Sequence, residues 1–241
     1  MHRWLYLIFF LFACTCSMYA HIHYPSIQIV INSKWPNKGL ISSMADRRPA
    51  ITKYPDAAGS PYFNESYKYA DVTMMNGRAF TNVKTRIDLV AQETYLITNG
   101  VETNISAGMV KEISYADTNS NNGTIVFYKF KIGFPPVDKL TVNHFYLVLA
   151  EGRYNFLKLI SKSVTEKKND FSGTMIKEFE TYEEYYVFSN GVMKRWKKDK
   201  DALLADLIDK QLQVNQFIVS NKINLKNPEQ VAKLLIYYNS L

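Results

Sequence analysis

Residues 76–100 read NGRAFTNVKTRIDLVAQETYLITNG. This stretch begins and ends with Asn-Gly, a dipeptide that tolerates the positive φ angles of a two-residue type I′ hairpin turn. Between the turns, residues 83–90 alternate apolar and polar side chains, as a strand with one solvated face does. Residues 93–98 form the next expected strand. The stretch therefore predicts consecutive antiparallel hairpins.

Similar strand-like segments, separated by turn residues, continue on both sides as far as Lys198. A third pair, Asn190-Gly191, joins the last two of them, whereas the polar residues 161–173 are expected to form a connection. Short strands at this spacing favour an antiparallel sheet in meander order, curled or closed into an incomplete barrel. The further expected strands are 70–75, 110–115, 124–132, 144–149, 154–160, 174–179, 184–188 and 192–196.

After Lys198 the apolar period becomes that of a helix. The third expected helix has the clearest start, with Asn227 as N-cap and Pro228 at the first helical position. The fold class is therefore α+β: an antiparallel β-meander or incomplete β-barrel followed by two or three short C-terminal helices. The first helical face consists of Leu203, Leu204, Leu207 and Ile208, and the second helix is expected at 211–221.

The chain divides into four expected segments. A signal peptide occupies residues 1–20, and residues 21–62 hold a strand at 27–31 and then a loosely ordered segment interrupted by proline and glycine. A β-rich domain spans residues 63–198. The C-terminal helical region, residues 199–241, is expected to pack on that domain.

The first residues have the order typical of a secretory signal peptide. Arg3 supplies positive charge, residues 4–12 are uncharged and apolar, and small or polar residues follow up to Ala20. So short an apolar run does not cross a bilayer, and no later stretch of the sequence is long and apolar enough to do so. The sequence therefore predicts an exported protein, periplasmic, outer-membrane-associated or extracellular, with no transmembrane span after signal cleavage.

Both cysteines, Cys14 and Cys16, lie inside the expected signal peptide. Cleavage near Ala20 would leave a mature chain without disulfides, thiolate catalysis or cysteine metal ligands. The alternative is a lipobox at residues 11–14, LFAC, in which Cys14 becomes the lipidated first residue of a lipoprotein.

The formal charge of the chain is +7 and is spread along its length. A positive surplus suits anionic envelope polymers or peripheral association with lipid head groups, and it also favours solubility. Nucleic acid is excluded as the partner of an exported protein. The densest basic patch is KRWKK, residues 194–198, where Trp196 either rests on a sugar ring or lipid head group or packs beneath a solvated strand end.

Histidines offer little chemistry in this sequence. His21 and His23 stand where a cleaved chain would begin, so they either bind a metal adventitiously or belong to a frayed terminus. His144 lacks a marked nucleophile and orienting acid, so we interpret it as structural. Phosphate-binding, nucleophile-elbow, zinc-helix and calcium-loop motifs are also missing from the sequence.

Unlike the histidines, the carboxylates and tyrosines form clusters in the sequence. Paired acids suit glycoside hydrolysis, but the four clustered glutamates also suit the charged edge of an exposed hairpin. We predict no catalytic residue, no cofactor and no metal site, and therefore a protein that is not an enzyme. The glutamates are Glu178, Glu180, Glu183 and Glu184; the aromatic groups are Tyr62, Phe63, Tyr67 and Tyr69, then Tyr182, Tyr185 and Tyr186, then Tyr237 and Tyr238.

Several short motifs of the C-terminal part occur together. They are Leu203-Leu204, NKINLK at 221–226, PEQV at 228–231 and LIYYNSL at 235–241, with weaker matches in GSPYF at 59–63, the Asn76-Gly77 hairpin with Asn82-Val83, and YNFLK at 154–158. In these motifs the chain resembles uncharacterised exported proteins of Bacteroidota-type bacteria. The resemblance implies a β-rich body, a helical C-terminus and an envelope or extracellular location, without an assigned activity.

Three functions are consistent with these features. The leading hypothesis is a non-enzymatic cell-envelope or secreted interaction module whose partner is an envelope protein or glycan. The alternative is a carrier of an apolar small molecule or lipid in a pocket of the curled sheet. The third is an envelope-polymer hydrolase that uses acids such as Glu180 and Glu184.

Overall fold

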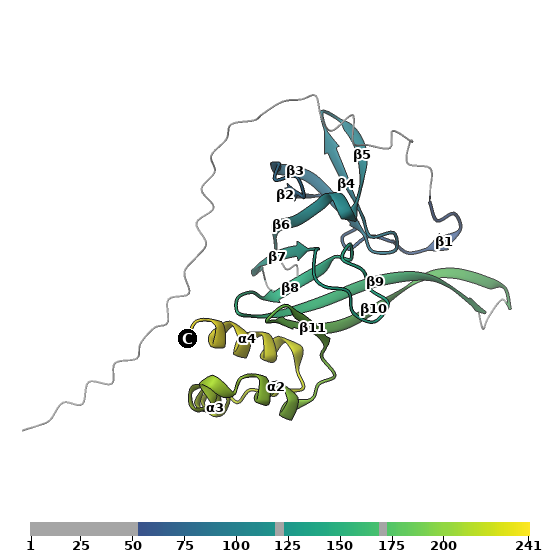
Figure 1. Ribbon diagram of the computed structural model, residues 1–241. Coiled ribbons are helices and arrows are strands. Elements are labelled where there is room, and N and C mark those ends of the chain that lie inside the picture. Colours follow the sequence, from purple (N-terminus) through teal and green to yellow (C-terminus); the bar gives the residue numbers. More distant parts are fainter. Residues whose placement is uncertain (1–52, 119–122, 169–172) are drawn as a thin grey trace, which may run out of the picture. The chain divides into compact units, whose positions relative to one another are not determined.

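The computed structural model describes residues 53–118, 123–168 and 173–241. The expected signal peptide, the strand at 27–31, Cys14, His21 and His23 lie outside the described residues. The described residues form a large sheet followed by short helices (Figure 1). The α+β fold class is therefore confirmed.

Eleven strands and three α-helices make up this fold in the described residues. The strands are β1 (Ala57–Ala58), β2 (Lys68–Met74), β3 (Ala79–Asp88), β4 (Glu93–Thr98), β5 (Val101–Ser106), β6 (Val110–Thr118), β7 (Ile125–Lys131), β8 (Tyr146–Ala150), β9 (Tyr154–Lys168), β10 (Met175–Ser189) and β11 (Val192–Arg195). The helical elements are η1 (Ala107–Met109), α2 (Lys200–Asp206), η2 (Ile208–Lys210), α3 (Gln211–Ser220) and α4 (Pro228–Asn239).

The sheet joins two meanders rather than following one. Its strand order is β1-β10-β9-β8-β7-β6-β2-β3-β4-β5, and β11 pairs with the far end of β10. Within each meander the strands are sequential, but β6 pairs with β2 instead of with its predecessor β5. The expected antiparallel pairing holds along the described sheet, except that β1 and β10 run parallel.

The short connection after β5 requires the sheet to curl. In a flat sheet, β5 and β6 would lie four strand spacings apart, about 19 Å. The three residues of η1 separate Ser106 from Val110, and that much chain spans about 14 Å at most. The sheet must therefore bend until β5 approaches β6, which confirms the incomplete barrel.

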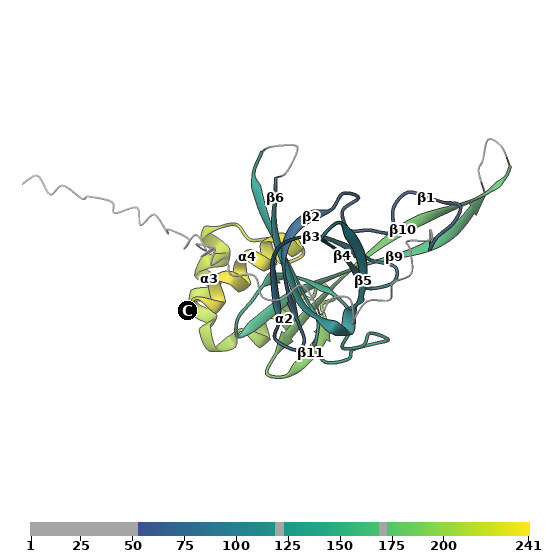
Figure 2. The same cartoon turned by 90° about the horizontal axis from the view of Figure 1, so that it is seen from above.

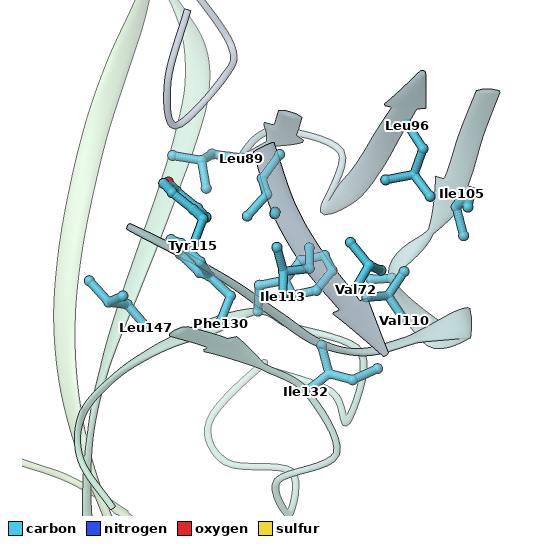
Figure 3. Close-up of a cluster of buried hydrophobic side chains, with 14 of the residues drawn as sticks. Val72, Leu89, Leu96, Ile105, Val110, Ile113, Tyr115, Phe130, Ile132 and Leu147 are labelled. Atoms are coloured by element: carbon cyan, nitrogen blue, oxygen red, sulfur yellow. The ribbon is translucent and has the colours of Figure 1, made fainter. Parts of the chain in front are cut away.

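Hydrophobic side chains fill the inside of this curl (Figure 3). Val72, Leu96 and Ile113 are completely buried, although they come from three different strands. Phe130 and Leu147 extend the same cluster to β7 and β8. The interior of the curl is therefore a packed core.

Two of the three Asn-Gly turns have the expected geometry. Positive φ angles at both residues, 53° and 76° for Asn99-Gly100 and 50° and 75° for Asn190-Gly191, are those of a type I′ turn. At the first turn only Gly77 has a positive φ, and the Met74 amide donates to the Arg78 carbonyl. The expected two-residue turn is wrong here, because that bond closes a three-residue loop.

The β9–β10 hairpin is longer than the sequence predicted. Residues 161–168 continue β9 instead of forming a connection, and the two strands expected at 174–179 and 184–188 are one strand, β10. Fifteen successive residue pairs join β9 to β10. Beyond Ser161 the ribbon carries polar side chains on both faces, so it lacks the alternation that marks a strand. Figure 2 shows this part of the hairpin extending away from the helices.

The helices pack on the part of the sheet formed by β8, β9 and the end of β10 (Figure 1). Phe156 of β9 contacts this helical layer, whereas the next residue, Leu157, enters a separate cluster on the opposite face. The predicted N-cap of α4 is confirmed, since the Asn227 side chain accepts hydrogen bonds from the Glu229 and Gln230 amides at 2.9 and 3.1 Å.

Candidate binding pocket

The clustered glutamates on β10 are separated and already paired. Glu180 and Glu184 share one face but stand four residues apart, about 13 Å along a strand, whereas hydrolytic carboxylates lie about 5–9.5 Å apart. Glu180 accepts a hydrogen bond from Tyr182 at 2.9 Å, and Glu184 accepts from Tyr186 at 2.7 Å. Glu183 is on the other face, 2.7 Å from the Lys158 ammonium. Glu180 and Glu184 therefore do not form a paired-acid site, and Glu178 is engaged in an ion pair with Lys167.

His144 has a local structural contact. The Thr141 backbone N–H donates to its Nδ1 at 3.0 Å, which fixes the turn before β8. Among the described residues, no group of three or more His, Cys, Asp or Glu side chains is arranged to hold a metal ion.

Trp196 lies beneath the basic patch rather than on it. Its side chain is 8% exposed and packs edge-on against Phe156 and Tyr185, with ring centroids 5.2 and 5.9 Å apart. Lys194 and Arg195 remain exposed around it. The indole face is therefore not presented to a ligand.

Two tyrosines of the first aromatic group, Tyr62 and Tyr67, lie against one cation. The Arg86 guanidinium lies 3.5 Å from the Tyr62 ring centroid and 4.5 Å from that of Tyr67. Glu102 holds the outer side of this cluster, since its carboxylate lies 3.7 Å from Arg86 and accepts the Tyr67 hydroxyl. Burial, with the hydrogen bond to Glu102, raises the pKa of Tyr67. The cluster thus fixes residues 60–67 to the sheet, although Arg86 Nε is buried within the described residues without a hydrogen-bond partner.

A polar pocket lies where the sheet meets the helices. It has a volume of about 150 Å³ and is partly open to solvent. The β8–β9 turn, the β10–β11 turn, α2 and α4 each contribute to its wall. The lining residues are Arg153, Tyr154, Ser189, Asn190, Val192, Lys194, Asp206 and Tyr238.

Asn239 holds one side of the pocket in place. Its side-chain oxygen accepts the Tyr154 amide at 2.9 Å, and its side-chain nitrogen donates to the Tyr154 carbonyl at 2.8 Å. Gly152 makes this approach possible, since a Cβ there would lie 2.6 Å from the Asn239 side chain. The turn that carries Arg153 is therefore fixed against α4.

Tyr154 and Asp206 form the inner wall. The Tyr154 hydroxyl donates to Asp206 Oδ2 at 2.6 Å, and burial together with this bond raises the pKa of Tyr154. The Lys194 ammonium lies 3.9 Å from Asp206 Oδ1, beyond hydrogen-bonding distance. Lys194 is thus attracted to the carboxylate while its N–H groups stay available.

A second acid supports the rim. Asp209 accepts the Tyr238 hydroxyl at 2.8 Å and pairs with Arg153 at 2.5 Å. The hydrogen bond from Tyr238, followed by that from Arg153, lowers the pKa of the Asp209 carboxyl. Two cations and two carboxylates therefore balance one another around the pocket.

The sequence did not reveal this pocket. Tyr154 and Asp206 are 52 residues apart, and Arg153 and Asp209 are 56 apart, so no local motif contains either pair. Of the predicted features, the Asn190-Gly191 turn, Lys194 of the basic patch and Tyr238 reach it. The turn was predicted as a hairpin, and Tyr238 as one member of an aromatic group.

Fold and pocket together define the class: an α+β protein in which a curled antiparallel sheet carries a C-terminal helical layer, with a polar pocket where the two meet. Comparisons of the chain with protein-family models, curated proteins and solved structures gave no significant match. In the part of the chain that the structure describes, no helix combines the length and apolar character needed to cross a membrane.

Proposed function

We propose that the chain is an exported, non-enzymatic module that binds an envelope macromolecule through the pocket between its sheet and its helices. The observation that carries the proposal is that Tyr154, Arg153 and Tyr238 are held in fixed pairs with two carboxylates, while Lys194 keeps its N–H groups available to a ligand. Asp206 accepts from Tyr154, and Asp209 holds Arg153 and Tyr238. Such fixed pairs orient a ligand, whereas hydrolysis requires a nucleophile or base free to react.

The export part of the proposal rests on the leader-like sequence of residues 1–20. The other two hypotheses have less support. Glu180 and Glu184 lie too far apart for a hydrolytic pair, and the curl that would enclose an apolar ligand contains Val72, Leu96, Ile113 and their neighbours.

Crosslinking in intact cells of the source organism tests the proposal. The tagged full chain is recovered after crosslinking, and attached envelope proteins and glycans are identified. We expect one partner to be recovered reproducibly, and less of it with Asp206→Asn, which changes the inner wall of the pocket. A chain recovered without a partner, or turnover of a glycan, ester or peptide by the purified protein, would contradict the proposal.

A further inference from the structure

We propose that the pocket binds one uncharged pyranose ring of a glycan, an inference that rests on the proposed binding function. Size gives the first argument. An engineered cavity of about 150 Å³ holds one benzene molecule, so a pocket of about 150 Å³ has room for the six ring atoms of one pyranose, with part of its hydroxyl groups at the open side. Its open side lets the rest of a glycan continue into solvent.

The charge balance favours an uncharged ligand. An anion attracted by Lys194 and Arg153 would also meet the carboxylate of Asp206. A cation attracted by Asp206 would meet both basic groups. Because the opposite charges lie close together, neither kind of ion gains a net attraction, whereas a neutral polar ligand pays no such penalty.

The free hydrogen-bonding groups match hydroxyls on neighbouring ring carbons. Lys194 retains its donors, while Asp206 Oδ1 remains an acceptor after Oδ2 has bonded Tyr154. Ser189 and Asn190 add a hydroxyl and an amide at the same wall. A sugar hydroxyl both donates and accepts, so it can bridge a lysine and a carboxylate as neither an amine nor a carboxylate ligand can.

The pocket is also held in one shape. The Asn239 side chain fixes the turn that carries Arg153, and the type I′ turn at Asn190-Gly191 fixes the opposite rim. Tyr154 and Tyr238 are 3% and 5% exposed, so the wall is packed from behind. A preformed site loses little conformational entropy on binding, which favours even a small ligand.

NMR titration of the full chain provides the test. The probes are the uncharged methyl glycosides of glucose, galactose, mannose and N-acetylglucosamine, with glucuronic acid and glucosamine as charged counterparts. We expect an uncharged glycoside to shift the signals of Tyr154, Ser189 and Lys194, and to bind more tightly than its charged counterparts. No shift up to the solubility limit of all four glycosides, shifts confined to other residues, or tighter binding of a charged sugar would overturn the inference.

Matched lysine variants locate the site. Lys194→Met removes a donor from the pocket, whereas Lys197→Met removes an exposed lysine outside it. Because hydrogen bonds to charged groups are worth about 1.5–3 kcal/mol, Lys194→Met should weaken binding by at least about tenfold and Lys197→Met should leave it unchanged. Equal affinities would overturn the inference. If crosslinking recovers a partner while no glycoside binds, the ring assignment fails and the proposed function stands; if no partner is recovered, the proposed function itself fails.

Discussion

Asn239 and Tyr154 exchange two hydrogen bonds, 2.9 and 2.8 Å long, between an amide side chain and a strand backbone. Asn239 thus takes the place that a neighbouring strand would have at the start of β9, because it offers the donor and acceptor of a ladder partner. The last helix is therefore fixed to the sheet by backbone bonding as well as by hydrophobic packing.

Replacing Asn239 should destabilise the fold. Asn239→Ala leaves the backbone N–H and C=O of the buried Tyr154 without partners, so we expect the free energy of unfolding to fall by about 2 kcal/mol. Urea denaturation followed by circular dichroism measures this change. Asn215→Ala, an exposed position on α3, is the control and should alter stability by no more than about 0.5 kcal/mol. A loss no greater than that of the control contradicts the role of Asn239.

Gly152→Ala should destabilise the fold through the same contact. Its Cβ would lie 2.6 Å from Asn239 Cγ, and the φ of 155° also disfavours a side chain. Gly133→Ala is the matched control, since Gly133 has a φ of 89° but nothing within 4 Å of an added Cβ. We expect Gly152→Ala to cost more than Gly133→Ala in urea denaturation. Combined with Asn239→Ala, it should cost less than the sum of the two single changes, and full additivity would exclude the contact as the cause.

Tyr95 should make stability sensitive to alkaline pH. Burial, followed by the nearby Asp88 carboxylate, raises the pKa of Tyr95 to about 12, from about 10 in an unfolded chain. The stability gained by keeping this phenol neutral is complete below about pH 10 and is lost as pH rises through about 12. Tyr95→Phe should therefore make stability fall less steeply with pH, by about 1.4 kcal/mol per pH unit in that interval.

Urea denaturation at a series of pH values between about 10 and 12 measures how steeply the free energy of unfolding falls with pH. Tyr69→Phe is the control for loss of a phenol from the surface, because Tyr69 is 58% exposed. An identical slope in Tyr95→Phe and the unchanged chain is the result that rejects the prediction.

Arg86→Lys should loosen residues 60–67. A planar guanidinium stacks on the Tyr62 ring at 3.5 Å, and an ammonium cannot reproduce that contact. We expect a loss of about 1 kcal/mol in thermal or urea unfolding. The reverse change on the same strand, Lys84→Arg, should be nearly neutral, because Lys84 is exposed. If both changes have the same effect, stacking by Arg86 is not what stabilises this segment.

The strands and helices whose limits are marked by nearby residues could be predicted from the sequence. The hairpin signal at Asn99-Gly100 located β4 at residues 93–98, and the Asn227-Pro228 pair located the start of α4. Prediction was wrong where side chains give no pattern, as in residues 161–168, which form a strand through backbone pairing with β10. The placement of β6 beside β2 was also missed, because it depends on the curl of the whole sheet.

The pocket could not be predicted, because its chemistry depends on distant pairs. Arg153 stands in a turn and Asp209 in a short 3₁₀ helix, and only the packing of the helices on β8 and β9 brings them together. Glu183 and Glu184 are neighbours in the sequence, but side chains alternate along a strand, so these two glutamates lie on opposite faces of β10. Proximity in sequence was therefore a poor guide to the site.

The parallel pairing of β1 with β10 affects the order in which the chain acquires its structure. Ala57 leaves the ribosome long before its partner Lys177, so this edge of the sheet cannot close until most of the chain has been synthesised. Contacts between such distant segments slow folding, because a long loop must close before they are gained. A nascent chain of this protein therefore remains incomplete for most of its synthesis, and a holding chaperone would bind it most readily during that interval.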